Sequence, residues 1–339
     1  MRENEPMVPD HGDPASASAP APRPAVALTL TVAVLTYRRP AELARALPAI
    51  LDQVRALGTD AQFAVSADVL VVDNDEAATA RLVVDALDSP LLRYVVEPRP
   101  GIAAARNRAL DETVGSDLLV FIDDDERPRT GWLSHLVRTW QVTRAAAVSG
   151  RVISEFDAGL DPWVAAGDFF RRRSMRTGTE IRVAAAGNLL LDLRQIRGLG
   201  LRFDSSLGLS GGEDTLFSRQ LQHRAGRIVW CEESAATDFV PAARTTRRWV
   251  LRRAWSHGNT ESVIDLHLAH SSFRRTLVRV NATVHGLARV AGGGGRYVLG
   301  LLTGSNRHQA RGLRSVCRGT GMLAGAFGVV YEEYARTES

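Results

Sequence analysis

An acidic cluster follows an apolar run in residues 120–128 (VFIDDDERP). Like charges repel and buried carboxylates are costly, so the cluster implies either a bound cation or a solvated turn in which an aspartate caps the next helix. Residues i and i+2 of an extended segment face the same side, so Asp123 and Asp125 can point into one site. Asp124 and Glu126 then support that site or face solvent. Carboxylates in this arrangement suit Mg²⁺ or Mn²⁺ held jointly with the phosphates of a substrate.

Polar residues also end two earlier apolar runs, at residues 28–36 and 67–75. Asp73 ends the second run, where its carboxylate could accept a hydrogen bond from the imide of a nucleobase. Thr36 and Tyr37 end the first run and could flank that base. The alternative for Asp73 is an Asx turn, because aspartate and asparagine favour turns.

A predicted helix at residues 101–113 (GIAAARNRALDET) follows Pro-Arg-Pro-Gly. Its first backbone N–H groups are free, and Arg106 and Asn107 lie one turn inside it, within reach of a nucleotide or a phosphate. Simple solvation of the helix surface is the alternative. The segment lacks the GK[ST] of a Walker loop, which disfavours nucleoside triphosphatase chemistry.

The segment LSGGEDTLFSRQL, residues 209–221, also has two interpretations. Ser210 and Glu213 have the S-x-x-E spacing of a capping box, which gives Glu213 a structural role. Asp214 is not used by that box, and it lies in the first turn of the helix beside two glycines that allow close approach of a substrate. A carboxylate there is a weak base that accepts a hydroxyl proton only as the new bond forms, which suits attack of a hydroxyl on an activated sugar.

Strands alternate with helices in the first part of the chain. Apolar runs predict strands at residues 28–36, 67–75, 91–97 and 117–122, and helical spacing predicts helices at residues 40–57, 76–87 and 101–113. This alternation implies an α/β, Rossmann-like fold with a mainly parallel sheet covered by helices on both faces. Ligands bind at the carboxyl ends of the strands in such sheets, so the candidate residues should share one rim.

Composition divides the chain into three segments. Residues 1–26 are rich in proline, alanine and serine and are predicted to be disordered. Residues 27–240 form the α/β domain, in which the order of elements becomes mixed beyond Gly131. The later elements predicted in this domain are helices at residues 132–143 and after the GGED motif, and strands at residues 146–153, 184–193 and 227–232. Residues 241–339 have helical spacing, with poor caps and an interruption at GGGG, residues 292–295.

The charge of the chain is concentrated at its end. All 42 basic residues are arginine, and residues 241–339 hold 15 of them against five acidic residues, whereas the whole chain of 339 residues has a net charge of +4. Such a segment suits an anionic partner such as a membrane surface, and a solvated helical face is the alternative. No nucleic-acid partner is expected, because no motif that reads nucleic acid is recognised.

Cysteine usage and hydropathy bear on the compartment. Cys231 and Cys317 are far apart and lack the spacing of a disulfide framework or a zinc site. No run of 18 apolar residues occurs, and the N-terminus lacks the apolar core of a signal peptide. We therefore expect a cytoplasmic protein, with peripheral contact at the inner face of the membrane as a further expectation for the basic C-terminal region.

Six motifs, taken in order, resemble those of glycosyltransferase family 2: LTYRRP (35–40), VVDND (71–75), EPRPGIAAARNRAL (97–110), FIDDDE (121–126), AAGNLLLD (185–192) and GGEDTLFSRQL (211–221). The resemblance covers about residues 28–240. It implies the GT-A nucleotide-diphospho-sugar transferase fold, followed here by a C-terminal helical extension. It also implies that a sugar is transferred, with inversion, from a nucleotide-diphospho-sugar donor to a hydroxyl of a glycan or lipid-linked acceptor, with a UDP-sugar as the first expectation for the donor.

The resemblance gives each candidate residue a role. Mn²⁺ or Mg²⁺ on the donor diphosphate would offset the charge of the departing nucleoside diphosphate. The implied assignments are base binding by Asp73, nucleotide contacts by Thr36, Tyr37 and Arg106, further nucleotide-sugar contacts by Asp124 and Glu213, metal binding by the DxD pair Asp123 and Asp125, and general base catalysis by Asp214 of the ED pair.

The chain departs from the processive members of this family. Their Q-x-x-R-W motif is matched only at its end, by TTRRW at residues 245–249, and no spanning helices are apparent, which favours addition of a single sugar. Arg247, Arg248 and Trp249 could still touch diphosphate or acceptor, or could form a basic helix with a core-facing tryptophan. Residues 171–173, three arginines, could meet the phosphate of a lipid-linked acceptor, although solvation is favoured. The alternative functions are a nucleotidyltransferase and a non-catalytic module that binds a nucleotide-sugar or glycan.

Overall fold

The computed structural model describes residues 28–207 and 209–331, so the segment predicted to be disordered lies outside the described residues. The strands are β1 (Leu28–Thr36), β2 (Val65–Asp73), β3 (Leu92–Val96), β4 (Leu118–Asp123), β5 (Glu126–Pro128), β6 (Ala147–Phe156), β7 (Asn188–Asp192) and β8 (Ile228–Val240). The helices are α1 (Pro40–Thr59), α2 (Arg81–Asp85), α3 (Ile102–Glu112), α4 (Trp132–Thr143), α5 (Pro162–Gly167), α6 (Leu193–Gly198), α7 (Glu213–His223), α8 (Arg247–His267), α9 (Ser272–Leu302) and α10 (Asn306–Ala326), with short 3-10 helices η1 (Ser205–Leu207) and η2 (Ala242–Arg244).

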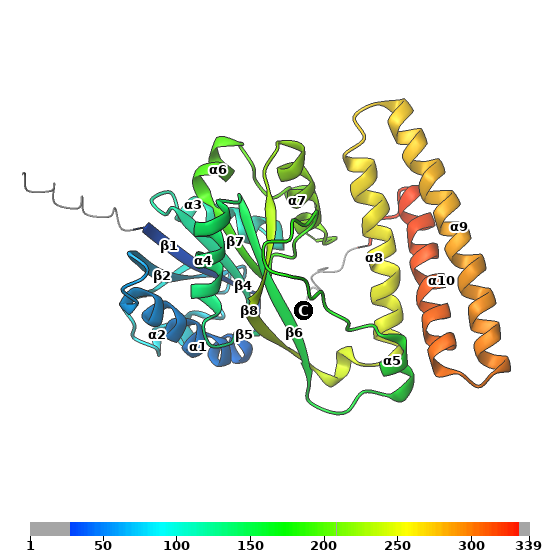
Figure 1. The fold of residues 1–339 in the computed structure, drawn as a ribbon, viewed down its shortest axis with the longest axis horizontal. Coiled ribbons are helices and arrows are strands. Elements are labelled where there is room, and N and C mark those ends of the chain that lie inside the picture. Colours follow the sequence, from blue (N-terminus) through cyan, green and yellow to red (C-terminus); the bar gives the residue numbers. More distant parts are fainter. Residues whose placement is uncertain (1–27, 208, 332–339) are drawn as a thin grey trace, which may run out of the picture.

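The strands of the described residues form one sheet in the order β3-β2-β1-β4-β7-β6-β8-β5 (Figure 1). The first four strands of that order are parallel to one another, β7 runs antiparallel to both of its neighbours, and β6 and β8 are again parallel. The short strand β5 pairs antiparallel with β8 at the edge. The predicted mainly parallel α/β sheet with a mixed second half is confirmed.

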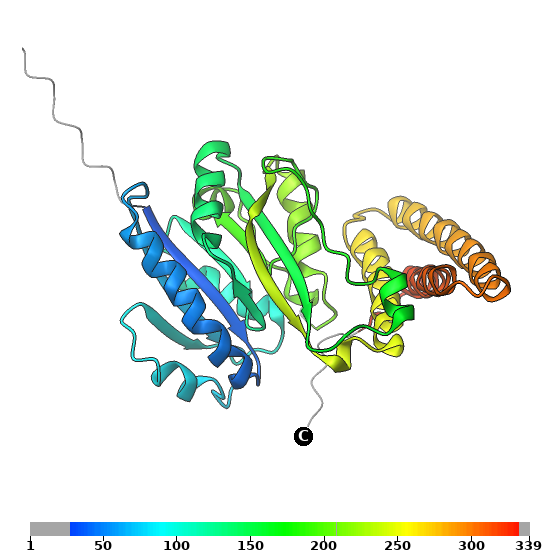
Figure 2. The ribbon, with the colours of Figure 1, turned by 60° about the horizontal axis from the view of Figure 1, so that its bottom comes forward.

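Alternation along the strands produces two apolar cores, one on each face of the sheet. Val32 and Val34 point into the core under α1 and α4, whereas Ala33 and Leu35 point into the core under α3 and α7. Successive residues of a strand face opposite sides, so a strand that is covered on both faces must be apolar throughout. Figure 2 shows the helices on both sides of the sheet. This layering holds the carboxyl ends of the central strands rigidly.

Three predicted elements differ most in length from the observed ones. The helix predicted at residues 76–87 is only α2, because Asp73 accepts hydrogen bonds from the backbone N–H groups of Asp75 (3.1 Å) and Ala80 (2.9 Å) and so holds the chain before α2 in a turn. The strand predicted at residues 184–193 is shorter, and the strand predicted to end at residue 232 extends to Val240 because its pairing with β6 resumes at Ala235 after a bulge.

The C-terminal helices form a layer beside the sheet, with α10 between α8 and α9 (Figure 1). Glycines allow this close packing. A Cβ atom at Gly321 of α10 would lie 2.0 Å from the backbone oxygen of Trp255 in α8, and one at Gly293 of α9 would lie 2.8 Å from the backbone oxygen of Gly312 in α10. The predicted interruption at residues 292–295 is therefore wrong, because these glycines continue α9 and one of them permits the contact with α10.

The caps of these helices are also better than predicted. The side chains of Thr246, Ser271 and Ser305 accept hydrogen bonds from backbone N–H groups in the first turns of α8, α9 and α10. This is the usual task of threonine and serine at a helix start. Within the described residues, none of the helices combines the length and the apolar content needed to cross a bilayer.

Candidate active site

The ends of three neighbouring strands bring the candidate residues to one rim. In the parallel register, Thr36 of β1 is opposite Asp73 of β2, and Leu35 of β1 is opposite Asp123 of β4. The strands run in the same direction, so their carboxyl ends lie side by side. The predicted common rim is confirmed for these positions.

The acidic cluster is a turn rather than an extended segment. β4 ends at Asp123, Asp124 and Asp125 form the turn, and Glu126 begins β5. The alternation of side chains expected for a strand therefore does not apply beyond Asp123. Asp124 and Glu126 are both buried, at 5% exposure, so the expectation that they could face solvent is wrong.

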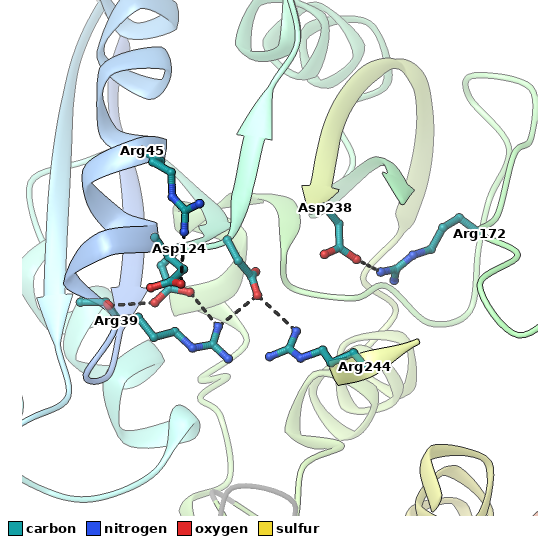
Figure 3. A network of polar contacts seen from close by, with 9 residues as sticks. Arg39, Arg45, Asp124, Arg172, Asp238 and Arg244 are labelled. Carbon is teal, nitrogen blue, oxygen red and sulfur yellow. Dashed lines mark hydrogen bonds and ion pairs between the residues drawn. The ribbon is translucent and has the colours of Figure 1, made fainter. Parts of the chain in front are cut away.

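Two arginines contact the turn from its open side (Figure 3). Arg39 donates to Asp124 at 3.2 Å and to Asp125 at 3.0 Å, and Arg244 donates to Asp125 at 3.3 Å. Asp124 also accepts a hydrogen bond from the hydroxyl of Thr36 at 2.8 Å. Asp124 and Thr36, both predicted to contact the nucleotide, are thus bonded to each other. Arg39 follows the first strand within the LTYRRP motif, but sequence reasoning assigned it no role, and it missed Arg244.

The charged forms of Asp123, Asp124 and Glu126 are destabilised. Burial, followed by the charge of Asp125, raises the pKa of Asp123 to about 7, although Arg106 opposes the shift. Burial raises the pKa of Asp124 to about 6 in spite of Arg39. Burial and the neighbouring carboxylates, Asp123 first, raise the pKa of Glu126 as well. A cation at this position would relieve the repulsion.

Asp123 and Glu126 point to the same small space. A Cβ atom at Gly187 would lie 2.6 Å from Oδ2 of Asp123 and 3.0 Å from Oε1 of Glu126, so only glycine leaves that space open. Oε2 of Glu126 is buried and has no hydrogen-bond donor among the described residues. Nor do the described residues form a group of three or more metal-ligating side chains. Mg²⁺ and Mn²⁺ can be held by one or two carboxylates when phosphate oxygens complete the coordination, and Asp123 and Glu126, which meet beside Gly187, fit such a cation.

Asp73 is fully buried and engaged within the protein. Besides the backbone groups of Asp75 and Ala80, its carboxylate accepts a hydrogen bond from the hydroxyl of Tyr94 at 2.8 Å. The contact with Asp75 is the Asx-type turn that the sequence left open. Tyr37 is half-buried. Base binding by Asp73 and Tyr37 stays a prediction.

The ED helix begins differently from the capping box that its sequence suggests. Gly211 and Gly212 adopt positive φ angles of 75° and 89°, and Gly212 is the N-cap of α7, which has no side-chain cap. Ser210 donates instead to the backbone oxygen of Leu207 at 3.3 Å. The predicted capping box is therefore wrong, because the two glycines turn Ser210 away from the first turn of α7. Glu213 is free for another partner.

That partner is Arg106 of α3. The two side chains form an ion pair that is 8% exposed at Arg106 and 4% exposed at Glu213. The guanidinium of Arg106 also lies 5.4 Å from the ring centroid of Phe203. Burial raises the pKa of Glu213 despite the charge of Arg106, and its Oε2 is buried with no donor among the described residues. The nucleotide contacts predicted for both residues stay predictions.

Asp214 follows Glu213 in the first turn of α7 and is half-buried. Its Oδ1 accepts hydrogen bonds from the backbone N–H and the hydroxyl of Thr215. In the part of the chain that the structure describes, no donor reaches Oδ2 of Asp214. This oxygen is therefore the one that could accept a proton from an acceptor hydroxyl.

A second acidic position lies beside the turn, at the end of β8. Asp238 is opposite Glu126 in the ladder between β5 and β8, and it forms an ion pair with Arg172 (Figure 3). Arg172 is exposed, as the favoured solvation of the arginine run implies, and it also has this acidic partner. Trp249 stacks on Phe170 with centroids 6.2 Å apart, and Arg247 pairs with Asp161 at 3.0 Å, in agreement with the structural alternative for this pair.

Comparisons with known proteins agree with the motifs. Residues 31–194 match the model of the family described as "Glycosyl transferase family 2". The succinoglycan biosynthesis protein ExoM of Rhizobium meliloti (strain 1021) is 36% identical over 242 residues, which cover 70% of this chain and 75% of ExoM.

Among solved structures, the crystal structure of GalNAc-T7 with UDP, GalNAc and Mn²⁺ matches with a TM-score of 0.49 and 15% identity, over 70% of this chain. The match covers 51% of that chain, about half of its length.

The matches in sequence favour sugar transfer over the two alternatives, a nucleotidyltransferase and a non-catalytic binding module. The observed α/β sheet agrees with the GT-A fold that the family match implies, and the observed C-terminal helices are the expected helical extension. With the family model matched over residues 31–194 and a relative that is 36% identical across 75% of its own length, the chain belongs to glycosyl transferase family 2 and is a glycosyltransferase.

Proposed function

We propose that the protein is an inverting glycosyltransferase that moves a sugar from a nucleotide-diphospho-sugar to a hydroxyl of a glycan or lipid-linked acceptor. The observation that carries this proposal is the buried pair of Arg106 and Glu213, which joins the helix that bears Asp214 to the neighbourhood of Asp123. Inversion needs a base and a leaving group on opposite sides of the sugar, and hence acidic groups from separate elements. The name of ExoM supports a role in the synthesis of a polysaccharide or related glycoconjugate.

In this proposal, a divalent cation, Mn²⁺ or Mg²⁺, is held by Asp123 and Asp125 with Glu126 beside them. The orphaned Oε2 of Glu126 and the open space at Gly187 support this assignment. When bound, the cation would neutralise negative charge on the departing nucleoside diphosphate. Arg39 and Arg244 would bind phosphate oxygens of the donor, because guanidinium groups suit phosphate and these two already lie on the open side of the turn.

Asp214 is the proposed base. Its Oδ2 would accept the proton of the acceptor hydroxyl as the oxygen attacks the anomeric carbon, while Thr215 holds Oδ1 and so fixes the orientation of the carboxylate. Glu213 anchors the start of α7 through Arg106 and so positions Asp214. The donor is proposed to be a UDP-sugar.

We also propose that α9 lies on an anionic membrane surface at the cytoplasmic face. Phe273, Leu277, Val280, Val284 and Leu287 share one face of α9 and are each more than half exposed. Residues 272–326, which include α9 and α10, contain nine arginines and no acidic residue. Two copies meeting through this face would bring like charges together, whereas acidic lipid headgroups would complement them.

A thermal-shift panel tests the donor site. UDP-, GDP- and dTDP-sugars are added to the purified chain with Mn²⁺ and with EDTA, and at least one donor should raise Tm only when Mn²⁺ is present. If none of the donors gives a metal-dependent shift in Tm, the proposed donor site is refuted.

Flotation with phosphatidylglycerol vesicles tests the membrane contact. The Val284→Glu variant should bind these vesicles more weakly, and neutral phosphatidylcholine vesicles should not bind the protein. If this variant binds the vesicles as strongly as the wild type does, or if light scattering shows dimers, the membrane contact is refuted.

A further inference from the structure

An open cavity of about 400 Å³ lies between α9, α10 and the chain that follows α5. It is far along the sequence from the acidic turn, and nothing in the proposed donor chemistry uses it. Its lining consists of six arginines with one aspartate and one serine: Asp168, Arg171, Arg289, Arg296, Arg311, Arg314, Ser315 and Arg318. A single acidic residue cannot neutralise six guanidinium groups.

The existing contacts use only part of this charge. Asp168 pairs with Arg311 at 3.2 Å and with Arg171 at 3.7 Å, and its backbone oxygen accepts from Arg314 at 3.0 Å. Arg318 pairs with Glu261 of α8 at 2.8 Å. The lining therefore keeps a large positive excess after these pairs are formed.

Two arginines of α9 add to the positive charge of the lining. For Arg289 and Arg296, no acidic partner exists among the residues that the structure describes. The Nε atoms of Arg296 and Arg318 are buried, and neither has a hydrogen-bond acceptor within the described chain. A buried donor without an acceptor costs free energy, and clustered like charges repel. An anion with several oxygens in the cavity would offset the repulsion between these guanidinium groups.

The pKa shifts of nearby groups agree with a positive potential in the cavity. Burial, and then the charges of Arg318 and Arg311, lower the pKa of Arg314. On α8, loss of hydration lowers the pKa of His257 to about 4, and Arg253, Arg318, Arg314 and Arg172 act in the same direction. With that pKa, His257 adds no positive charge of its own at pH 7. The potential around the cavity is strongly positive.

The fold holds these arginines in place. Arg289 and Arg296 are seven residues apart on α9, and Arg311, Arg314 and Arg318 follow one face of α10. The contact between Gly293 and Gly312 brings the two helices close, so that both sets line one cavity. Five of the six arginines of the cavity are thus carried by two helices that pack closely against each other.

We propose that this cavity binds a phosphate or diphosphate group at a site separate from the donor site. Guanidinium groups bind phosphate oxygens through paired, charge-assisted hydrogen bonds, and several of them converge here on one space. The group could belong to an acceptor linked through diphosphate or to the headgroup of an anionic phospholipid. Both sources present the same chemistry to the arginines.

The cavity is connected to the acidic turn through consecutive residues. Arg171 lines the cavity, and its neighbour Arg172 reaches Asp238, which pairs in the β5–β8 ladder with Glu126. A ligand in the cavity would therefore contact Arg171, and the loop that carries Arg171 also reaches the proposed metal site through Arg172 and Asp238. This connection rests on the proposed function, whereas binding of the phosphate group does not.

The test uses the full chain in EDTA, so that metal-dependent binding at the donor site is suppressed. Titration calorimetry with pyrophosphate should give saturable binding by the wild type. Arg296→Gln and Arg314→Gln should each weaken it about tenfold or more, because each removes a charge and paired donors. Arg307→Gln, an exposed arginine on α10 outside the cavity, is the matched control and should bind as the wild type does. Arg289→Gln, at an exposed position of α9, replaces the buried variants if they fail to fold.

Competition distinguishes the sources of the phosphate. If phosphatidylglycerol vesicles displace pyrophosphate from the wild type, and the cavity variants lose this displacement, the headgroup is the ligand. If pyrophosphate binds and the vesicles do not displace it, a diphosphate-linked acceptor is the ligand. No binding of pyrophosphate by the wild type, or equal binding by the wild type and the cavity variants, would overturn the proposal. The metal-dependent donor shift is measured separately, so either proposal can fail alone.

Discussion

Arg106 and Glu213, 107 residues apart in the chain, form an ion pair that is shielded from solvent on both sides. The pair ties α3, which follows the third strand, to the start of α7. Since Asp214 is the next residue after Glu213, and Arg106 also acts on the charge of Asp123, this one contact links the proposed base to the proposed metal site. The first two predictions concern these two acidic groups, and the third concerns the pair itself.

Replacing Asp214 by asparagine should abolish most transfer while donor binding persists. The amide cannot accept the hydroxyl proton, so kcat should fall by about 10²–10⁴-fold, the usual contribution of a general base. The Mn²⁺-dependent thermal shift with the donor should stay as in the wild type. Asp111→Asn, which alters a solvent-exposed pair with Arg202, is the control and should retain full turnover. Near-wild-type turnover of Asp214→Asn would show that another group is the base.

Changes at the acidic turn should act on metal affinity. Asp123→Asn and Glu126→Gln should each remove a carboxylate from the space at Gly187, and Asp125→Ala should weaken donor binding that depends on metal. Isothermal titration with Mn²⁺ and the donor measures this loss, which we expect to be about tenfold or larger for Asp123→Asn. Glu155→Gln, an exposed acidic residue on β6, serves as the control. Unchanged Mn²⁺ affinity in Asp123→Asn would place the metal elsewhere.

Breaking the buried pair should cost stability. Glu213→Ala leaves the guanidinium of Arg106 buried without its partner, so we expect a loss of about 3–5 kcal/mol in the free energy of unfolding. Replacing both residues, in the Arg106→Met, Glu213→Leu double variant, should recover much of that loss while transfer stays impaired. Urea unfolding of the single and double variants measures both effects. If the single change costs less than about 1 kcal/mol, the pair is not the anchor of α7.

The metal-free protein should become more stable as the pH falls from 8 to 6. The folded-state pKa values of Asp123 and Asp124, about 7 and about 6, lie above the usual value of 3.8, so the folded chain binds more protons than the unfolded chain in this window. The free energy of unfolding therefore decreases as pH rises through it. In EDTA, Tm at pH 6 should exceed Tm at pH 8 by at least about 2 °C. Asp123→Asn should reduce this difference, and an undiminished difference would assign it to other groups.

Glycines in the C-terminal helices should differ sharply in their tolerance of alanine. At Gly321 a Cβ atom would lie 2.0 Å from the backbone oxygen of Trp255, so Gly321→Ala should force α8 and α10 apart and cost about 1–3 kcal/mol. At Gly295 nothing lies within 4 Å, and Gly295→Ala should stabilise α9 by about 0.5–1 kcal/mol. Thermal unfolding of the two variants compares them directly. Equal effects would mean that glycine packing does not set the spacing of the helices.

The sequence by itself determined the sheet and the rim. Short, mostly apolar runs such as residues 28–36 indicate strands covered on both faces, and their alternation with helices favours parallel strands whose carboxyl ends meet. It also drew attention to the acidic cluster, because so many carboxylates at the end of a buried strand are costly without a cation. These inferences rest on the spacing of apolar residues and on the free-energy cost of clustering buried carboxylates, and both can be assessed from the sequence alone.

The tertiary structure decided what each polar group contacts. The S-x-x-E spacing predicted a local cap at Glu213, but two glycines with positive φ turned Ser210 away, and a partner 107 residues distant took its place. Asp73 was engaged by Tyr94 from the neighbouring strand, Glu126 was buried beside Gly187, and arginines scattered over α9 and α10 gathered around one cavity. Such pairings depend on strand register and helix packing. The spacing of residues along the chain does not predict these pairings, because they form only when segments far apart in sequence are brought together.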